Sequence, residues 1–196
     1  MEKEIILASA SPRRKELLKL ITDKFIVIPA VGEEVSDDLL SPAERVEKIA
    51  CRKAVEVSEK NPGYTVIGAD TTVFCGGDAL GKPADEADAG KMLTRLSGRI
   101  HNVITAVAIA QTGKIVKVFS EETEVEFYCL SDEEIDRYVK SGEPMDKAGG
   151  YGIQGMGALL VKGIKGDYYN VMGLPVGRLY RELYQLRNDG IFSLDD

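Results

Sequence analysis

The amino-acid sequence predicts an α/β protein, and three observations support this class. Short apolar runs typical of buried strands alternate with segments whose apolar residues recur at helical spacing. Several helical segments begin at a serine or an aspartate, which are among the best side chains for capping a helix N-terminus. Hydrophobic residues make up 44% of the 196 residues, which suffices for a sizeable core. We therefore expect one domain over residues 1–196, with room for two lobes.

The chain opens with a strand that leads directly into a helix. Residues 5–8 form the apolar run, and Ser11 followed by Pro12 provides an N-cap and a proline at the first helical position. Backbone N–H groups at such a junction lack helical partners, so an anion placed there is stabilised. Arg13 and Arg14 follow, about 100° apart around the helix. We expect one of them to bind an anionic ligand; the alternative is a helix start with two solvated arginines.

An acidic loop, residues 32–38, follows a predicted strand at residues 25–30. A solvated loop is the usual fate of such a run of charges. The alternative is that Glu33 or Glu34 faces a pocket, where its carboxylate could hold a divalent metal ion. The residues alone leave both interpretations open.

The next helix, residues 41–58, begins with a capping box in which Ser41 precedes Pro42 and Glu44. Its apolar residues follow helical spacing, and Lys53 falls within the same stripe. An unpaired ammonium buried there would lower stability substantially. Lys53 must therefore either extend its stem to water or meet a phosphate or a carboxylate.

A buried strand over residues 65–75 carries Asp70, although aspartate is disfavoured inside strands. Asp70 is either a turn residue or a residue placed for chemistry, and the strand-like residues that follow it weaken the turn interpretation. Residues 76–78 make a hairpin turn that returns the chain to Lys82, which a glycine and a proline flank. The hairpin could thus bring Lys82 back towards Asp70.

The middle of the chain continues the alternation of helices and strands. We predict helices at residues 85–96 and 131–141, and strands at residues 101–110, from 115 onward and at 121–128. His101 is the only histidine, so a histidine-based metal cage is excluded and His101 is interpreted as structural or loop-positioning. Acid–base chemistry must then fall on carboxylates.

A glycine-rich segment, residues 147–157, carries five glycines in eleven residues. Such a backbone can approach a ligand closely, or it can be a flexible connection. Its lysine, tyrosine and glutamine favour a shaped loop in which the amide of Gln154 reads the edge of a base. We predict a strand at 158–161, a turn at 166–170 and a closing helix at 175–186.

Charge and cysteine content exclude several classes of protein. The net charge of −7, from 32 acidic and 25 basic residues, argues against nonspecific binding to nucleic acid. Three scattered cysteines match neither a disulfide framework nor a zinc-ligand spacing, which favours a reducing compartment. No signal peptide and no membrane-spanning run of about 20 apolar residues is evident. We therefore expect a soluble cytoplasmic protein without a membrane partner.

Taken together, the candidate residues favour phosphate chemistry: two arginines at a helix start, two lysines, Asp70, an acidic pair and a glycine-rich loop. Cations neutralise a polyphosphate, a divalent metal ion held by carboxylates bridges its oxygens, and a carboxylate orients or deprotonates water. The P-loop pattern is absent, and no Gly-x-Gly-x-x-Gly follows a strand as a dinucleotide site requires. Kinase and dehydrogenase functions are therefore disfavoured.

Five motifs in order along the chain resemble those of the Maf family, once called septum formation proteins. They are LASASPRR at 7–14, GADT at 68–71, GKP at 81–83, LSGR at 96–99 and KAGGYGIQG at 147–155. Together they span essentially the whole chain, and YGIQG resembles the branch that acts on dTTP and UTP. The resemblance implies a nucleoside triphosphate pyrophosphatase, a house-cleaning hydrolase that cleaves at the α-phosphate and releases a nucleoside monophosphate and pyrophosphate.

The resemblance also implies a fold and an assembly. The fold is similar to that of the inosine triphosphate pyrophosphatases, with a mixed, elongated central sheet flanked by helices and two lobes around a cleft. The family implies a homodimer whose partner in the reaction is a nucleoside triphosphate, with a divalent cation, Mg²⁺ or Mn²⁺, as cofactor.

Carried over position by position, the resemblance implies a role for each candidate residue. Asp70 resembles the proton acceptor that takes a proton from water. Glu34, rather than Glu33 by spacing, resembles a metal-associated acid, so that Glu34 and Asp70 would hold the cation. The family's phosphate-binding set resembles Ser9, Arg13, Arg14, Lys53 and Lys82, and the resemblance implies that Lys53 and Lys82 also take part in catalysis.

The positions linked to substrate choice in the family match Arg13, Thr71 and Gln154. A glutamine offers both a donor and an acceptor to the edge of uracil or thymine, which favours a pyrimidine nucleotide.

Two other functions compete with this one. The first is a regulator of cell division or septum formation that binds nucleotide or DNA and hydrolyses it only incidentally. The second is an enzyme of the same fold that prefers methylated nucleotides such as 7-methyl-GTP. Asp70 distinguishes the pyrophosphatase from the regulator, because a sensor needs the basic residues but no general base at the site. Turnover of a panel of nucleotides distinguishes it from the enzyme for methylated nucleotides.

Overall fold

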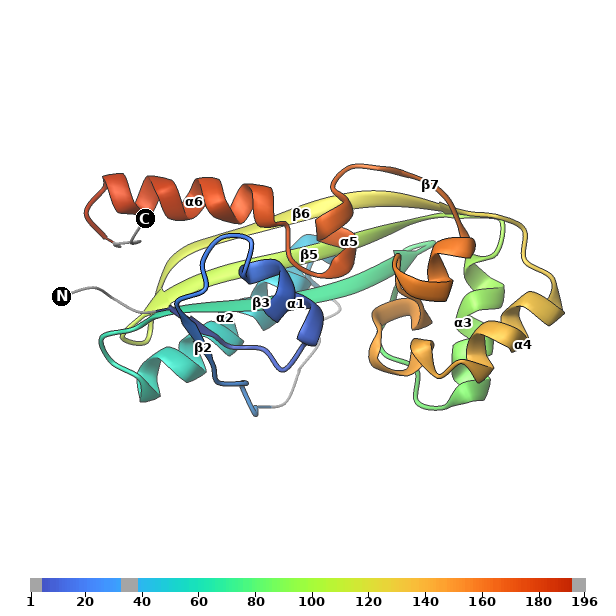
Figure 1. Cartoon of the computed structure of the whole chain (residues 1–196), viewed down its shortest axis with the longest axis horizontal. Helices are drawn as coiled ribbons and strands as arrows, with labels where there is room; N and C mark the ends of the chain where they lie inside the picture. The colour runs from blue at the N-terminus through green and yellow to red at the C-terminus, as the bar shows by residue number, and fades with distance from the viewer. Residues whose placement is uncertain (1–4, 33–38, 192–196) are drawn as a thin grey trace. The chain divides into compact units, whose positions relative to one another are not determined.

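The computed structural model describes residues 5–32 and 39–191. In the first half of the chain the elements are β1 (Ile5–Leu7), α1 (Pro12–Leu18), β2 (Phe25–Val27), α2 (Pro42–Lys60), β3 (Thr65–Cys75), β4 (Asp78–Leu80), α3 (Glu86–Leu96) and β5 (Ile100–Gln111). The second half contains β6 (Lys114–Phe127), α4 (Asp132–Lys140), the 3₁₀ helices η1 (Glu143–Asp146), η2 (Ala148–Gly150) and η3 (Gly155–Leu159), β7 (Val161–Lys165), α5 (Tyr168–Met172) and α6 (Val176–Asn188) (Figure 1). The strands form a mixed sheet in the order β2-β1-β3-β5-β6-β7, with β4 paired to β3. The predicted α/β class is confirmed.

The chain divides into two compact units. The first unit comprises residues 1–70, 105–120 and 173–196, and the second comprises residues 71–104 and 121–172. Strands β3, β5 and β6 each contribute residues to both units. In β3 the division falls between Asp70 and Thr71, directly beside the predicted proton acceptor.

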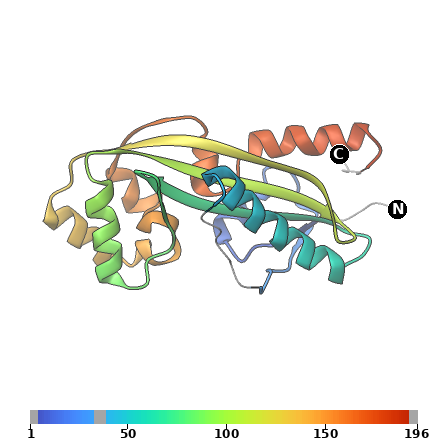
Figure 2. The ribbon, with the colours of Figure 1, turned by 180° about the vertical axis from the view of Figure 1, so that it is seen from behind.

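In the first unit, β1 lies between two strands that run parallel to it. Ile5 pairs with Phe25 of β2 and with Thr65 of β3. Parallel neighbours require crossover connections, which α1 and α2 provide. Figure 2 shows α2 lying along the strands of this unit. A cluster of buried residues joins β1, β3 and α2: Ile6, Ala8, Val57 and Val66.

In the second unit, β3 turns back on itself as β4. Val73 pairs with Leu80 in this antiparallel hairpin, and Gly76 and Gly77 form the predicted turn with φ of +61° and +90°. Strand β7 pairs antiparallel with β6. Helices α3 and α4 lie side by side (Figure 1), both pack against η1, and α3 also packs against η2. Their apolar faces enclose a second core, which includes Leu93, Leu96, Phe127, Ile135, Tyr138 and Tyr151.

The helix starts follow the cap signals in the sequence. Ser41 Oγ accepts a hydrogen bond from Glu44 N at 3.4 Å, and Glu44 Oε2 accepts one from Ser41 N at 2.9 Å. Ser131 and Glu134 repeat this capping box at the start of α4. Hydrogen bonds from the serine hydroxyl and backbone lower the pKa of the Glu44 carboxyl. Within the described residues, no helix combines the length and the apolar character that crossing a membrane requires.

Two predicted elements near the C-terminus are wrong. The strand expected at 158–161 is mostly the 3₁₀ helix η3, and the strand begins only at Val161, where it pairs with β6. The turn expected at 166–170 contains the start of α5, where the Asp167 carboxylate accepts a hydrogen bond from Tyr169 N at 2.8 Å. In addition, the strands expected from 115 and at 121–128 are one continuous strand, β6.

Candidate active site

The strand-to-helix junction at the N-terminus forms as predicted. The chain leaves β1 with Ala8 N donating to the Ile67 carbonyl oxygen at 2.8 Å. Ser11 is the N-cap of α1 and accepts a hydrogen bond from Arg14 N at 3.5 Å, with Pro12 at the first helical position. The junction therefore lies against β3, the strand that carries Asp70.

Arg14 connects three segments of the first unit. Its Nε donates to the Gly173 carbonyl oxygen at 2.8 Å, and its Nη1 donates to the Ala69 carbonyl oxygen at 2.8 Å and to Ser9 Oγ at 3.2 Å. Hydrogen bonds from a charged donor are among the stronger ones in proteins. Arg14 thus fixes the backbone beside Asp70, a role that its position in the sequence did not reveal. Direct binding of phosphate by Arg14 stays a prediction.

Lys53 meets a carboxylate. Its Nζ lies 2.7 Å from Asp70 Oδ1, and the two side chains are only 14% and 10% exposed. Of the interpretations open for this lysine, an anionic partner is the one that the structure contains. The pair is partly shielded from water, so it is stronger than a surface ion pair of the same length.

The close approach of α2 to β3 makes this ion pair possible. A Cβ placed on Gly68 would lie 2.6 Å from the Ala50 carbonyl oxygen and 2.7 Å from Ala54 N, so only glycine fits there. Gly68 and Asp70 share one face of β3, because side chains alternate along a strand. Lys53 precedes Ala54 on the helix that packs on this face. The glycine therefore lets the helix bring Lys53 to Asp70.

The first unit thus brings four predicted site residues together. Arg14 reaches the peptide next to Asp70, Ser9 accepts from Arg14, and Lys53 pairs with Asp70. Ser9 and Asp70 are 8% and 7% exposed. Two cations beside one buried carboxylate create a locally positive region in a protein whose net charge is −7, and such a region favours an anionic substrate.

The other predicted site residues lie elsewhere in the chain. Arg13 is half-buried on α1. Glu34, like its alternative Glu33, lies outside the described residues. The remaining three belong to the second unit: Thr71 is half-buried on β3, Lys82 is exposed after β4, and Gln154 is exposed at the start of η3. Their approach to Asp70 stays a prediction.

Asp70 is the predicted metal-binding carboxylate that lies within the described residues. Among residues 5–32 and 39–191, no three histidine, cysteine, aspartate or glutamate side chains are grouped so that they could hold a metal ion. Mg²⁺ in phosphate-processing sites commonly takes one or two carboxylates and completes its shell with phosphate oxygens and water. Asp70 provides one carboxylate, so the described residues are compatible with such a site.

The second unit contains buried polar side chains whose roles only the structure shows. His101 Nε2 lies 2.7 Å from the Tyr151 hydroxyl, and both rings pack edge-on against Phe127. Burial lowers the pKa of His101 to about 4 and raises that of Tyr151, so both are neutral near pH 7. The structural interpretation of His101 agrees with this geometry.

Comparison with known proteins adds independent findings. The family model described as "Maf-like protein" matches residues 4–186. A protein of Bacillus velezensis named dTTP/UTP pyrophosphatase is 53% identical over 183 residues, which cover 93% of this chain and 96% of the relative. One of the same name from Bacillus thuringiensis is 52% identical over 187 residues, covering 95% of this chain and 97% of that protein.

A solved structure supports the fold. The structure of a HAM1 protein from Coxiella burnetii aligns with a TM-score of 0.56, covering 93% of this chain and 99% of that one. At 18% sequence identity, this likeness concerns the fold alone.

Proposed function

The chain belongs to the family of Maf-like proteins, and we propose that it is a nucleoside triphosphate pyrophosphatase that hydrolyses dTTP and UTP. The names of the relatives that share about half of its residues support the reaction. The observation that carries the proposal is the position of Asp70: a largely buried carboxylate, paired with Lys53 and next to a peptide that Arg14 holds. This arrangement provides a base and cations in one place, as hydrolysis of a phosphoanhydride requires.

The reaction needs one proton transfer and one displacement. Asp70 accepts a proton from a water molecule while the water oxygen bonds to the α-phosphorus. The bond from that phosphorus to the oxygen bridging the α- and β-phosphates breaks, so pyrophosphate leaves and the nucleoside monophosphate remains. Lys53 orients the carboxylate, and Arg13, Lys53 and Lys82 neutralise the triphosphate.

A divalent cation completes the proposed site. Asp70 and Glu34 would hold Mg²⁺ or Mn²⁺ together with phosphate oxygens. When bound, the cation neutralises charge on the triphosphate and polarises its oxygens. Two measurements test this proposal: activity as a function of metal concentration, and calorimetry with a non-hydrolysable dTTP analogue. The analogue should bind more tightly in the presence of the cation than in its absence.

We propose that the residues at the family's substrate-choice positions select the nucleotide base. The carboxamide of Gln154 can donate one hydrogen bond and accept another, which matches the edge of uracil or thymine. We infer that Arg13 and Thr71 contribute to the same selection. A site built to hydrogen-bond one base rejects another that leaves its polar groups unpaired.

The substitution Asp70→Asn tests the mechanism. We expect hydrolysis of dTTP and UTP to fall by about 10²-fold or more, because the amide cannot accept the proton. Binding of an α,β-methylene analogue of dTTP, measured by calorimetry, should persist. The matched control is Asp136→Asn on the exposed side of α4, which should leave turnover unchanged. Equal turnover by Asp70→Asn and the wild type would contradict the role of Asp70 as base.

A panel of nucleotides tests the substrate. Turnover of dTTP, UTP, dCTP, dATP, dGTP and 7-methyl-GTP should be compared with Mg²⁺ and with Mn²⁺, with pyrophosphate and phosphate measured separately. We expect dTTP and UTP to be preferred and pyrophosphate to be the product. A preference for 7-methyl-GTP would contradict the pyrimidine assignment, and tight nucleotide or DNA binding without turnover would favour the regulator.

We further infer that the protein acts in the cytoplasm as a homodimer. This inference rests on the family resemblance, and the family supports the nucleoside triphosphate as the reaction partner. Light scattering coupled to size-exclusion chromatography should give twice the chain mass of 21.4 kDa. A monomer mass at micromolar concentration would contradict it.

A further inference from the structure

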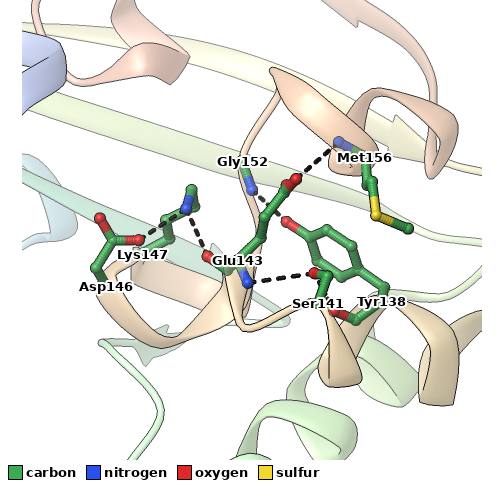
Figure 3. Close-up of polar contacts among 7 residues, drawn as sticks. All are labelled: Tyr138, Ser141, Glu143, Asp146, Lys147, Gly152 and Met156. Carbon is green, nitrogen blue, oxygen red and sulfur yellow. Dashed lines mark hydrogen bonds and ion pairs between the residues drawn. The ribbon is translucent and has the colours of Figure 1, made fainter.

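Residues 152–157 form a turn that is closed at its base. A Cβ on Gly157 would lie 2.0 Å from the Gly152 carbonyl oxygen and 2.8 Å from the Tyr138 hydroxyl, so the two ends of the turn touch. Gly152 N donates to the same hydroxyl at 3.1 Å (Figure 3). The buried ring of Tyr138 therefore supports both ends of a turn in which Gln154 has an exposed side chain.

Glu143 supports the far side of the same turn. Its Oε1 accepts a hydrogen bond from Met156 N at 3.1 Å. A Cβ on Gly155 would lie 2.8 Å and 2.9 Å from the two carboxylate oxygens, and Gly155 has a φ of +62° that favours glycine. Figure 3 shows the Glu143 side chain extended towards the backbone nitrogen of Met156. The turn is thus held at its base by a hydroxyl and at its far side by a carboxylate.

The Glu143 carboxylate also interacts with the Tyr138 hydroxyl. Burial raises the pKa of this hydroxyl, and the Glu143 carboxylate raises it further. The same carboxylate accepts from Met156 N, and the same hydroxyl accepts from Gly152 N. The two groups that support the turn therefore lie beside each other.

The backbone of Glu143 is itself fixed from two sides. Glu143 N donates to Ser141 Oγ at 3.2 Å, and Lys147 Nζ donates to the Glu143 carbonyl oxygen (Figure 3). Lys147 also pairs with Asp146 at 2.7 Å and is only 16% exposed. These bonds fix the backbone from which the Glu143 side chain reaches Met156 N.

The residues on either side of Gln154 are therefore held, whereas its own side chain faces solvent. Tyr151, just before the turn, is buried with its hydroxyl at His101. Gln154 makes no side-chain cap bond to η3. We propose that Glu143 and Tyr138 are positioning residues for base selection, which preform the turn so that the carboxamide of Gln154 is presented to a pyrimidine base. This inference rests on the proposed function.

Preforming the turn affects selection rather than the chemical step. A glutamine on an unsupported turn must be ordered when the base binds. The conformational entropy lost in this ordering makes the free energy of binding less favourable. The loss falls on nucleotides that Gln154 recognises and not on those that it does not. Removing the support should therefore lower kcat/KM for dTTP and UTP while leaving poor substrates such as dCTP nearly unchanged.

The experiment compares kcat/KM for dTTP, UTP and dCTP in Glu143→Ala, Tyr138→Phe and Glu143→Gln. In the first two, the preference for dTTP over dCTP should fall about five- to tenfold, which corresponds to the loss of one hydrogen bond. Glu143→Gln keeps an oxygen that can accept from Met156 N, so it should restore most of the preference. Glu133→Ala, an exposed glutamate on α4, is the matched control and should keep the wild-type preference.

A second background separates positioning from a general structural effect. In Gln154→Ala the preference is already lost, so adding Glu143→Ala should lower it no further. An equal loss in both backgrounds would overturn the proposal, as would a wild-type preference in both Glu143→Ala and Tyr138→Phe. If Glu143→Ala does not fold, Tyr138→Phe carries the test because it keeps the buried ring. A wild-type protein that does not release pyrophosphate from dTTP would instead refute the proposed function.

Discussion

Lys53 and Asp70 place opposite charges 2.7 Å apart, with most of both side chains out of water. The substitution Lys53→Met keeps the length of the stem but removes the ammonium from the carboxylate and from the expected triphosphate. We expect turnover to fall about a hundredfold. The free energy of unfolding should fall by about 1–3 kcal/mol, because the largely buried Asp70 carboxylate loses its partner. Steady-state kinetics and urea unfolding measure the two effects.

The matched control for this substitution is Lys48→Met, at an exposed position of the same helix. It removes the same charge without touching Asp70, so it should change neither turnover nor stability appreciably. A large stability loss with normal kinetics in Lys53→Met would show that the ion pair serves the fold alone.

His101 predicts a dependence of stability on pH. Burial lowers its pKa from 6.5 to about 4, and the group facing it is the neutral Tyr151 hydroxyl. Between these values the unfolded chain binds a proton that the folded protein does not, so the free energy of unfolding falls as pH falls. From pH 7 to 5.5 we expect a loss of about 1 kcal/mol.

The measurement is urea unfolding at both pH values in the wild type and in His101→Gln. The chain has one histidine, and hydrogen bonds lower the pKa of carboxyls such as Glu44 and Glu56 from their ordinary value, so they stay ionised in the folded protein over this range while His101 changes charge in the unfolded chain. His101→Gln should be less stable than the wild type at pH 7, but its free energy of unfolding should change less between pH 7 and pH 5.5. An equally steep loss in the variant would assign the effect to other groups.

The packing of α2 on β3 depends on a single missing Cβ. Gly68→Ala would place a methyl group 2.6 Å from the Ala50 carbonyl oxygen and push the helix away from the strand. We expect a stability loss of about 1–3 kcal/mol. Turnover should fall as well, because the helix that moves carries Lys53. Thermal unfolding and hydrolysis of dTTP measure the two effects.

The control for this prediction is Gly90→Ala in α3, where a Cβ meets no atom within 4 Å. A glycine in a helix is less favourable than alanine by about 0.5–1 kcal/mol, so this variant should be slightly more stable than the wild type. Equal behaviour of the two variants would mean that the helix–strand contact at Gly68 tolerates a methyl group.

Elements with local signals were predictable and the others were not. The starts of α2 and α4 could be predicted because each capping box is a local motif of four residues, beginning at Ser41 and at Ser131. The start of β7 at Val161 depends instead on pairing with β6, a strand far away in the chain. Glycines around η3 permit several conformations, so only this pairing decides between them.

The same distinction applies to the candidate site. The helical stripe of α2 indicated that Lys53 points towards the core, and the strand pattern marked Asp70 as unusual. The bond of Arg14 to Gly173 joins residues 159 positions apart, and nothing local signals it. The support of the turn by Tyr138 and Glu143 is equally invisible, since tertiary packing alone brings them to glycines further along the chain.

At the scale of the whole molecule, three strands contribute residues to both units. These strands, β3, β5 and β6, are hydrogen-bonded neighbours in the sheet. Because β3 passes from one unit to the other between Asp70 and Thr71, unfolding the second unit would fray the strand beside the predicted base. Loss of structure in either unit should therefore destabilise the other. This is the physical basis for expecting residues 1–196 to behave as one cooperative domain.

Native-state hydrogen exchange tests this expectation. The slowest amides of the first unit, such as that of Val66, and of the second, such as that of Leu93, should exchange with free energies within about 1 kcal/mol of each other. Gly68→Ala lies in the first unit and should lower both values equally, because each amide would open only in global unfolding. Leu93 keeping its wild-type value in that variant, while Val66 loses protection, would show that the units unfold independently and that Asp70 lies at a true domain boundary.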